Sequence, residues 1–171
     1  MGEILKKMRG QRRQHFAGDV FVLQLEDDSY RFGRIVKVAD DTREARFPGG
    51  ILAYIYDIPS VDQTPDLAQL TPDRLLMPPF FTMGWVWYKG YFRTVTHAEL
   101  NPGDLLKQHC FYDAYYKDYV DENDRRIGER ADPCGVFALS NFEFFQHEVD
   151  EALAGRPIVG RLVGRQRAGD E

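Results

Sequence analysis

Tyrosine and acidic side chains are interleaved along residues 112–132, a composition suited to binding a basic protein surface. Aromatic side chains supply buried anchors at protein interfaces, whereas carboxylates raise the association rate and orient a positively charged partner. An ordinary solvated hairpin of the same composition is the alternative interpretation. The candidate partner-binding residues are Tyr116, Asp118, Tyr119, Asp121, Glu122 and Asp124.

The histidines, cysteines and serines form no recognisable catalytic or metal-binding motif. His15, His97, His109 and His147 stand at no metal-ligand spacing, and neither cysteine belongs to a C-x-x-C pair. His109 and Cys110 are adjacent, but neighbouring side chains of an extended chain point to opposite faces. Phosphate-binding glycine loops and a G-x-S-x-G nucleophile elbow are also missing from the sequence. The sequence therefore predicts a protein that is not an enzyme and needs no cofactor or metal.

Seven aromatic side chains crowd residues 80–92 and admit two interpretations. Exposed, they would form a stacking platform for single-stranded nucleic acid. Buried, they would supply the large apolar surface that a small β-rich core needs. Few basic residues are interleaved with them, which favours the core. An aromatic-lined pocket on the sheet, serving a small ligand or an enzymatic reaction, remains the alternative function.

Composition indicates a single folded domain with a formal net charge of −5 in 171 residues. This charge disfavours nucleic acid as a partner and suits a basic one. No apolar run is long enough to span a membrane, and no secretory signal is recognisable, so we expect a cytoplasmic protein without membrane contact. Cys110 and Cys134 are accordingly expected to be free thiols.

Apolar periodicity and turn signals predict a mainly β (α+β) fold: a bent antiparallel sheet or SH3-like small barrel with one C-terminal helix. The helix covers residues 141–154, with Ser140 as its cap and Glu143 at the capping-box spacing. Gly33 interrupts a good strand and predicts either a bulge or a close approach of another backbone. The predicted strands cover residues 20–25, 30–38, 51–58, 83–88, 91–96, 111–120, 125–130 and 134–139.

The two ends of the chain differ in composition from the middle. Residues 1–17 form a basic N-terminal arm, in which a short helix through Ile4, Leu5 and Met8 is one reading. The β-rich domain covers residues 18–160, with an edge strand over 157–163 as an option, and residues 161–171 are a charged tail.

The first predicted hairpin also carries a family resemblance. Residues 18–36 read G-D-V-F-x-x-x-L-x-D-x-x-Y-x-F-G-R-I-V, which resembles the opening of the immunity protein 26 family of bacterial polymorphic toxin systems. The resemblance implies an antitoxin that binds and neutralises a cognate toxin, such as a nuclease, without catalysis. It also implies structural rather than contact roles for the matched positions Gly18, Asp19, Phe32, Gly33 and Arg34.

Overall fold

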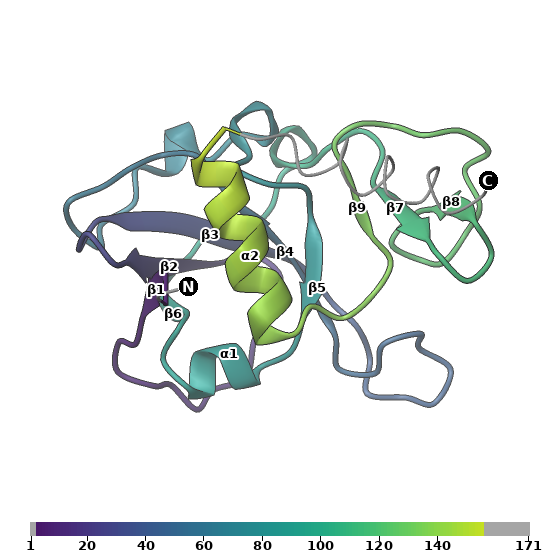
Figure 1. The fold of residues 1–171 in the computed structure, drawn as a ribbon. Helices are drawn as coiled ribbons and strands as arrows, with labels where there is room; N and C mark the ends of the chain where they lie inside the picture. Colours follow the sequence, from purple (N-terminus) through teal and green to yellow (C-terminus); the bar gives the residue numbers. More distant parts are fainter. Residues whose placement is uncertain (1–2, 156–171) are drawn as a thin grey trace.

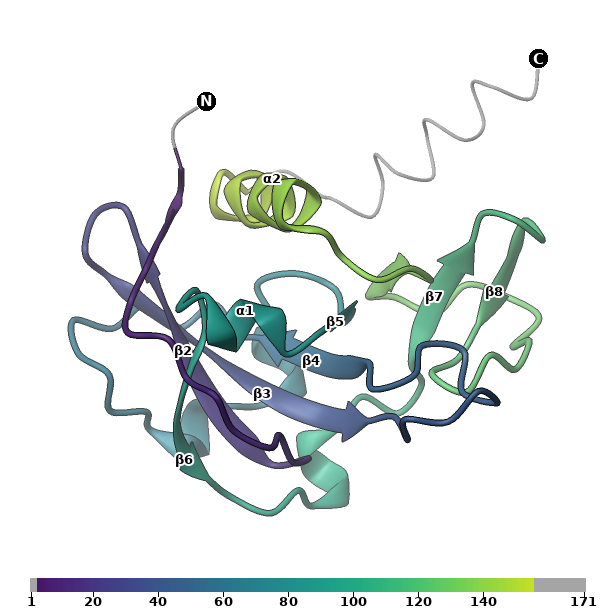
Figure 2. The same ribbon diagram turned by 90° about the horizontal axis from the view of Figure 1, so that it is seen from below.

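Six strands form one curled antiparallel sheet in the computed structural model, which describes residues 3–155 (Figure 1). The strand order is β1-β2-β3-β4-β5. β6 also pairs with β2, on the side away from β3. It pairs with the first half of β2, whereas β1 pairs with the last two residues. Figure 2 shows the curl of the sheet from below. The strands are β1 (Leu5–Lys6), β2 (Asp19–Leu25), β3 (Tyr30–Val38), β4 (Ile51–Ile55), β5 (Phe80–Thr82) and β6 (Arg93–His97). The predicted fold class is confirmed.

A small second sheet lies beside β5, at the right of Figure 2. It consists of β7 (Cys110–Asp113), β8 (Asp118–Val120) and β9 (Cys134–Val136), with β7 in the centre. β8 is antiparallel to β7, whereas β9 is parallel to it. A bridge from Phe81 to Leu139 and a hydrogen bond from Ser140 N to Phe81 O (2.8 Å) connect the second sheet to the first.

Helix α2 (Phe142–Leu153) covers one face of the large sheet (Figure 1). Its Phe145 ring packs 5.1 Å from Phe80 and 5.2 Å from Phe92, measured between centroids. Asn141 caps the helix by accepting a hydrogen bond from the Phe144 amide (2.8 Å), so the predicted Ser140 cap is wrong by one residue. Three 3₁₀ turns, Leu67–Gln69, Pro72–Arg74 and Pro102–Asp104, lie in the connections.

The central strands are buried on both faces. One face of β2, β3 and β4 packs against the helices, and the other is covered by the connections around residues 58–76 and 95–106. All five residues of β4 are consequently buried. No helix within residues 3–155 is long and apolar enough to cross a membrane.

The first hairpin has the predicted strands, and Gly33 lies where a backbone must approach closely. An added Cβ at Gly33 would overlap the Phe21 ring and lie 2.7 Å from the Tyr54 carbonyl oxygen. The pairing of Gly33 with Phe21 and Ile55 is regular, so the bulge alternative is wrong at this position. The register shift between β3 and β4 falls between Ile35 and Lys37 instead.

The N-terminal segment is extended rather than helical. Leu5 is buried opposite Leu25, which corrects the predicted short helix. Met8 N then donates to Gly90 O at 2.8 Å, and the missing Cβ of Gly90, which has a left-handed φ of 89°, leaves room for the Met8 backbone. Pairing with the sheet supplies hydrogen bonds that a frayed helix of this length lacks.

The predicted second hairpin is wrong in its first half. Residues Trp85–Tyr88 form the short helix α1, and β6 pairs with β2 rather than with this segment. The Gly84 carbonyl accepts from both Trp87 N and Tyr88 N, which closes the helical turn. Trp87 and Phe92 are fully buried, so the interpretation of this aromatic stretch as core is confirmed.

The predicted strand 111–120 is interrupted by a turn at residues 114–117, which divides it into β7 and β8. The strands predicted over 51–58 and 134–139 are shorter than expected, and residues 125–130 contribute only a bridge from Arg126 to Val120. The predicted edge strand 157–163 and tail 161–171 lie outside the described residues.

Cys110 and Cys134 form a disulfide, contrary to the expected free thiols. The parallel register of β7 and β9 places the two residues directly opposite each other, with a Cα–Cα distance of 4.7 Å. The two cysteines are 24 residues apart, and no local sequence pattern predicts that their strands pair.

We expect Gly33→Ala to lower the free energy of unfolding by about 1–3 kcal/mol, because the methyl group must displace the Phe21 ring. Gly103→Ala is the control, since an added Cβ there meets nothing within 4 Å. Urea unfolding of both variants measures the difference. If Gly33→Ala and Gly103→Ala had the same free energy of unfolding, the contact between the Phe21 ring and Gly33 would not require a glycine.

Candidate functional site

The tyrosine-rich hairpin ends in a rigidly held turn. Asp113 is buried, and its Oδ1 accepts hydrogen bonds from Tyr115 N (3.0 Å) and Tyr116 N (3.4 Å). Lys117 completes the reversal with a left-handed φ of 53°. The turn therefore projects two tyrosines from a backbone fixed by a buried carboxylate.

Tyr115 and Tyr116 are the most exposed aromatic pair of the described chain, at 81% and 61% of their full accessibility. Their rings meet edge to face with centroids 4.8 Å apart. The Arg126 guanidinium lies 5.8 Å from the Tyr116 ring centroid and pairs with Asp118 at 3.4 Å. Two amphipathic rings held in place at low entropic cost are the kind of group that anchors protein interfaces.

A second turn, at the opposite end of β8, contains the remaining predicted acids. Asp121 Oδ1 accepts from Asn123 N (2.8 Å) and Arg125 N (3.0 Å), so this carboxylate holds the turn. Glu122 turns inward and contacts His109, whereas Asp124 is exposed. The six predicted partner-binding residues thus do not form a single cluster.

Of these six residues, Tyr116 lies in the first turn, Asp118 and Tyr119 lie on β8, and Asp121, Glu122 and Asp124 lie in the second turn. Tyr119 is partly buried and packs edge to face on Tyr112 at 5.4 Å.

A buried chain of hydrogen bonds runs inward from Glu122. Glu122 Oε2 lies 3.1 Å from His109 Nδ1, and His109 Nε2 lies 2.5 Å from the Tyr54 hydroxyl. The Leu106 amide donates to the Tyr54 oxygen (3.1 Å), which leaves the phenol proton for His109 Nε2. An ionised carboxylate only accepts hydrogen bonds, so His109 Nδ1 donates to Glu122.

Burial sets the protonation of this chain. Desolvation raises the pKa of Tyr54 to about 12, which keeps the phenol neutral. The hydrogen bond from His109 lowers the pKa of Glu122 below its ordinary value. Sequence reasoning missed His109 and Tyr54 because they are 55 residues apart and carry no local motif.

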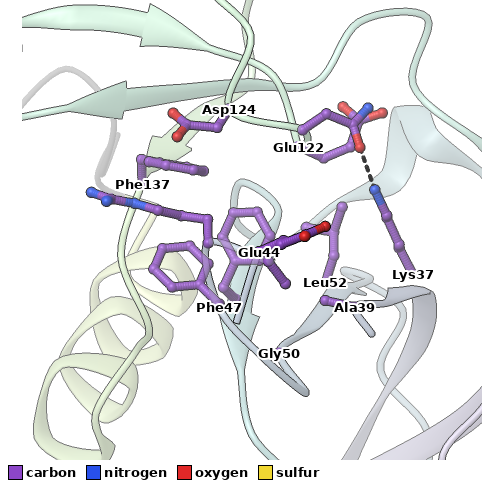
Figure 3. A pocket seen from close by; sticks show the side chains of 13 residues that line it. Lys37, Ala39, Glu44, Phe47, Gly50, Leu52, Glu122, Asp124 and Phe137 are labelled. Atoms are coloured by element: carbon purple, nitrogen blue, oxygen red, sulfur yellow. Dashed lines mark hydrogen bonds between the residues drawn. The ribbon is translucent and has the colours of Figure 1, made fainter. Parts of the chain in front are cut away.

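A cavity of about 420 Å³ lies between the two sheets, next to the hydrogen-bonded chain from Glu122 to Tyr54 (Figure 3). Its apolar wall consists of Leu52, Phe47, Phe81 and Phe137. The polar lining includes Lys37, Glu44, Arg46, Glu122, Asn123 and Asp124. Two predicted partner-binding residues thus line a cavity that the sequence did not indicate, since its walls come from four separate segments.

A second, open groove of about 640 Å³ contains an aspartate–histidine pair. Asp19 is buried and accepts from the Phe16 amide (3.0 Å), and its Oδ1 lies 2.8 Å from His97 Nδ1. Arg13 approaches the same carboxylate at 3.7 Å. Asp19 thereby ties the start of β2 to the end of β6. Among residues 3–155, no group of histidine, cysteine or acidic side chains is arranged to hold a metal ion.

A family model described as Immunity protein 26 matches residues 17–121, more than half of the chain. The chain belongs to the immunity protein 26 family. The resemblance of the first hairpin is thereby confirmed. None of the curated proteins and none of the solved structures matches the chain.

The positions that match the family motif hold the fold in this structure. Gly18 has a left-handed φ of 98°, and Asp19 makes the contacts described above. Arg34 is buried and its Nη2 donates to the carbonyls of Ala98 (2.7 Å) and Glu99 (3.0 Å). Phe32 is buried in the sheet. These contacts fasten the connection after β6 to the first hairpin.

We expect Glu122→Gln to make the free energy of unfolding depend less on pH in the acid range. Because the folded protein lowers the pKa of Glu122, this carboxylate stabilises the fold above pH 4.5, and its contribution is lost as the pH falls through the lowered value. Urea midpoints between pH 6 and pH 3 should therefore decline less steeply in the variant than in the wild-type protein. Glu99→Gln, at an exposed position, should keep the wild-type slope. Parallel profiles for Glu122→Gln and wild type would contradict the assigned hydrogen bond.

Proposed function

We propose that this protein is a cytoplasmic immunity protein that binds a cognate bacterial toxin of a polymorphic toxin system and blocks it without catalysis. The match of residues 17–121 to the immunity protein family is the observation that carries the proposal. Such a role requires a folded scaffold with a partner-binding surface rather than a reactive centre.

The proposed partner surface is formed by β8 and the turns at its two ends, which carry Tyr116, Asp118, Tyr119, Asp121, Glu122 and Asp124. The exposed Tyr115–Tyr116 turn supports it, because a large aromatic pair on a fixed backbone loses little entropy when it is buried. A nuclease toxin would present a positively charged substrate groove, which carboxylates can enter. Among the acids, Asp124 suits this role best, since Asp118, Asp121 and Glu122 have partners within the protein.

A small-ligand function is the second candidate, and the cavity lined by Phe47, Phe81 and Phe137 favours it. The aromatics expected to line such a pocket, in residues 80–92, are mostly buried in the core instead.

The test of the proposed function is protection from the toxin encoded beside this gene. Cells that produce the toxin domain should survive when the full chain is produced with it, and the two purified proteins should elute together in size-exclusion chromatography. Unrelated toxins should remain lethal. Death of the protected cells, with separate elution of the two proteins, would contradict the proposal.

Replacing Tyr116 by alanine should weaken toxin binding by about 30-fold, the loss typical of a central aromatic anchor. Tyr88→Ala is the matched control, because Tyr88 is 51% exposed and lies on α1, away from the proposed surface. Surface plasmon resonance gives both dissociation constants. If Tyr116→Ala and Tyr88→Ala bind alike, the contact lies on another face.

A further inference from the structure

The cavity beside the second turn has an aromatic wall of three mutually packed rings. Phe47 lies 5.1 Å from both Phe81 and Phe137, and Phe81 lies 5.7 Å from Phe137, measured between centroids. Leu52, buried in β4, completes the apolar wall. The rings belong to the loop after β3, to β5 and to the segment after β9, so the fold itself builds this wall.

Two carboxylates at the cavity are exposed to solvent. Glu44 reaches it from the loop after β3 and Asp124 from the turn after β8 (Figure 3). Neither side chain makes a hydrogen bond or an ion pair with the part of the chain that the structure describes. Asp124 is held in place by its backbone, which has a left-handed φ of 61° and donates to Asp121 O (3.2 Å).

The other charged groups of the cavity already have partners. Glu122 is bound to His109, and Lys37 Nζ donates to Asn123 Oδ1. The Arg46 guanidinium lies 5.7 Å from the Phe137 centroid. A guanidinium of this chain thus already lies on the Phe137 ring of the aromatic wall, whereas Phe47 is only half-buried.

Aromatic faces combined with free carboxylates favour a flat cation on an apolar stem. Guanidinium stacks on aromatic rings and donates hydrogen bonds from its edge to carboxylates, in a flatter geometry than a compact ammonium offers. The cavity volume of about 420 Å³ admits one long side chain with its hydration. Known ligand pockets range over about 300–1,000 Å³, so this one lies at the small end.

We infer that this cavity receives an arginine side chain of the partner toxin, with Phe47 stacking on the guanidinium and Glu44 and Asp124 neutralising its charge. The inference rests on the proposed function, since the arginine belongs to the toxin. The arginine would be a second toxin contact besides the exposed tyrosine turn. Its charge and planar shape would make this second contact specific.

The cavity can be tested without the toxin. The full ¹⁵N-labelled chain is titrated with N-acetyl-arginine methylamide and, separately, with the citrulline analogue, which has the same shape but no charge. We expect saturable shifts of the Phe47, Leu52 and Phe137 amides, at several-fold lower concentrations of the arginine probe. Equal affinities for the two probes, or no saturable shift at these amides, would overturn the inference.

The double variant Glu44→Gln/Asp124→Asn should bind the arginine probe no better than the citrulline probe. Asparagine tolerates the left-handed conformation at position 124, so the turn is retained. The control Glu26→Gln/Glu99→Gln removes two exposed carboxylates elsewhere and should bind like wild type. An undiminished preference for arginine in the first variant would also overturn the inference.

The toxin then separates this inference from the proposed function. If the wild-type chain neutralises the toxin, the Glu44→Gln/Asp124→Asn variant should bind it at least tenfold more weakly than the control. Wild-type affinity in that variant would refute the arginine contact and leave the proposed function standing. A wild-type chain that binds the arginine probe but not the toxin would refute the proposed function and the partner assignment, while the cation preference of the cavity would remain.

Discussion

The Phe21 ring lies over Gly33, and the large sheet is organised around this contact. Only a glycine leaves the space that the ring occupies between β2 and β3. From there, the ring stacks on Phe92 at 4.5 Å and meets the edge of Trp87 at 5.1 Å. Trp87 Nε1 in turn donates to Thr94 Oγ1 (3.1 Å), on the strand that pairs with β2. One missing Cβ therefore allows the hairpin, α1 and β6 to share a core.

This arrangement gives the matched positions of the family motif structural roles. Gly18, Asp19, Gly33 and Arg34 make contacts within the sheet or to the connection that follows β6. By contrast, the exposed tyrosine turn belongs to the second sheet, and the aromatic cavity lies between the two sheets beside the loop after β3. A scaffold with fixed internal contacts can present different loops to different toxins, because loops tolerate changes that a packed core does not.

The sequence predicted those elements whose patterns are local. The hairpin of β2 and β3 has alternating apolar residues and an acidic turn, and α2 has helical spacing with a cap, so both are recognisable within about 20 residues. Residues 83–88 were misassigned because their aromatic content favours strand, whereas tertiary packing places them in a helical turn. The Cys110–Cys134 disulfide was missed because it depends on the parallel pairing of β7 and β9. The cavity depends on four distant segments and has no sequence signature.

Neighbouring carboxylates in this sequence have different roles, and only geometry distinguishes them. Asp121 holds a turn, Glu122 is bound to a buried histidine, and the Asp124 side chain is exposed. Tyr116 and Asp124 flank the three-residue strand β8, which spans about 10 Å. A standard interface buries about 800 Å² on each partner, so one toxin surface can cover both the tyrosine turn and the cavity. The β7–β8 pairing fixes the separation of the tyrosine turn and the cavity, so a toxin that used both proposed contacts would have to match their spacing as well as their chemistry.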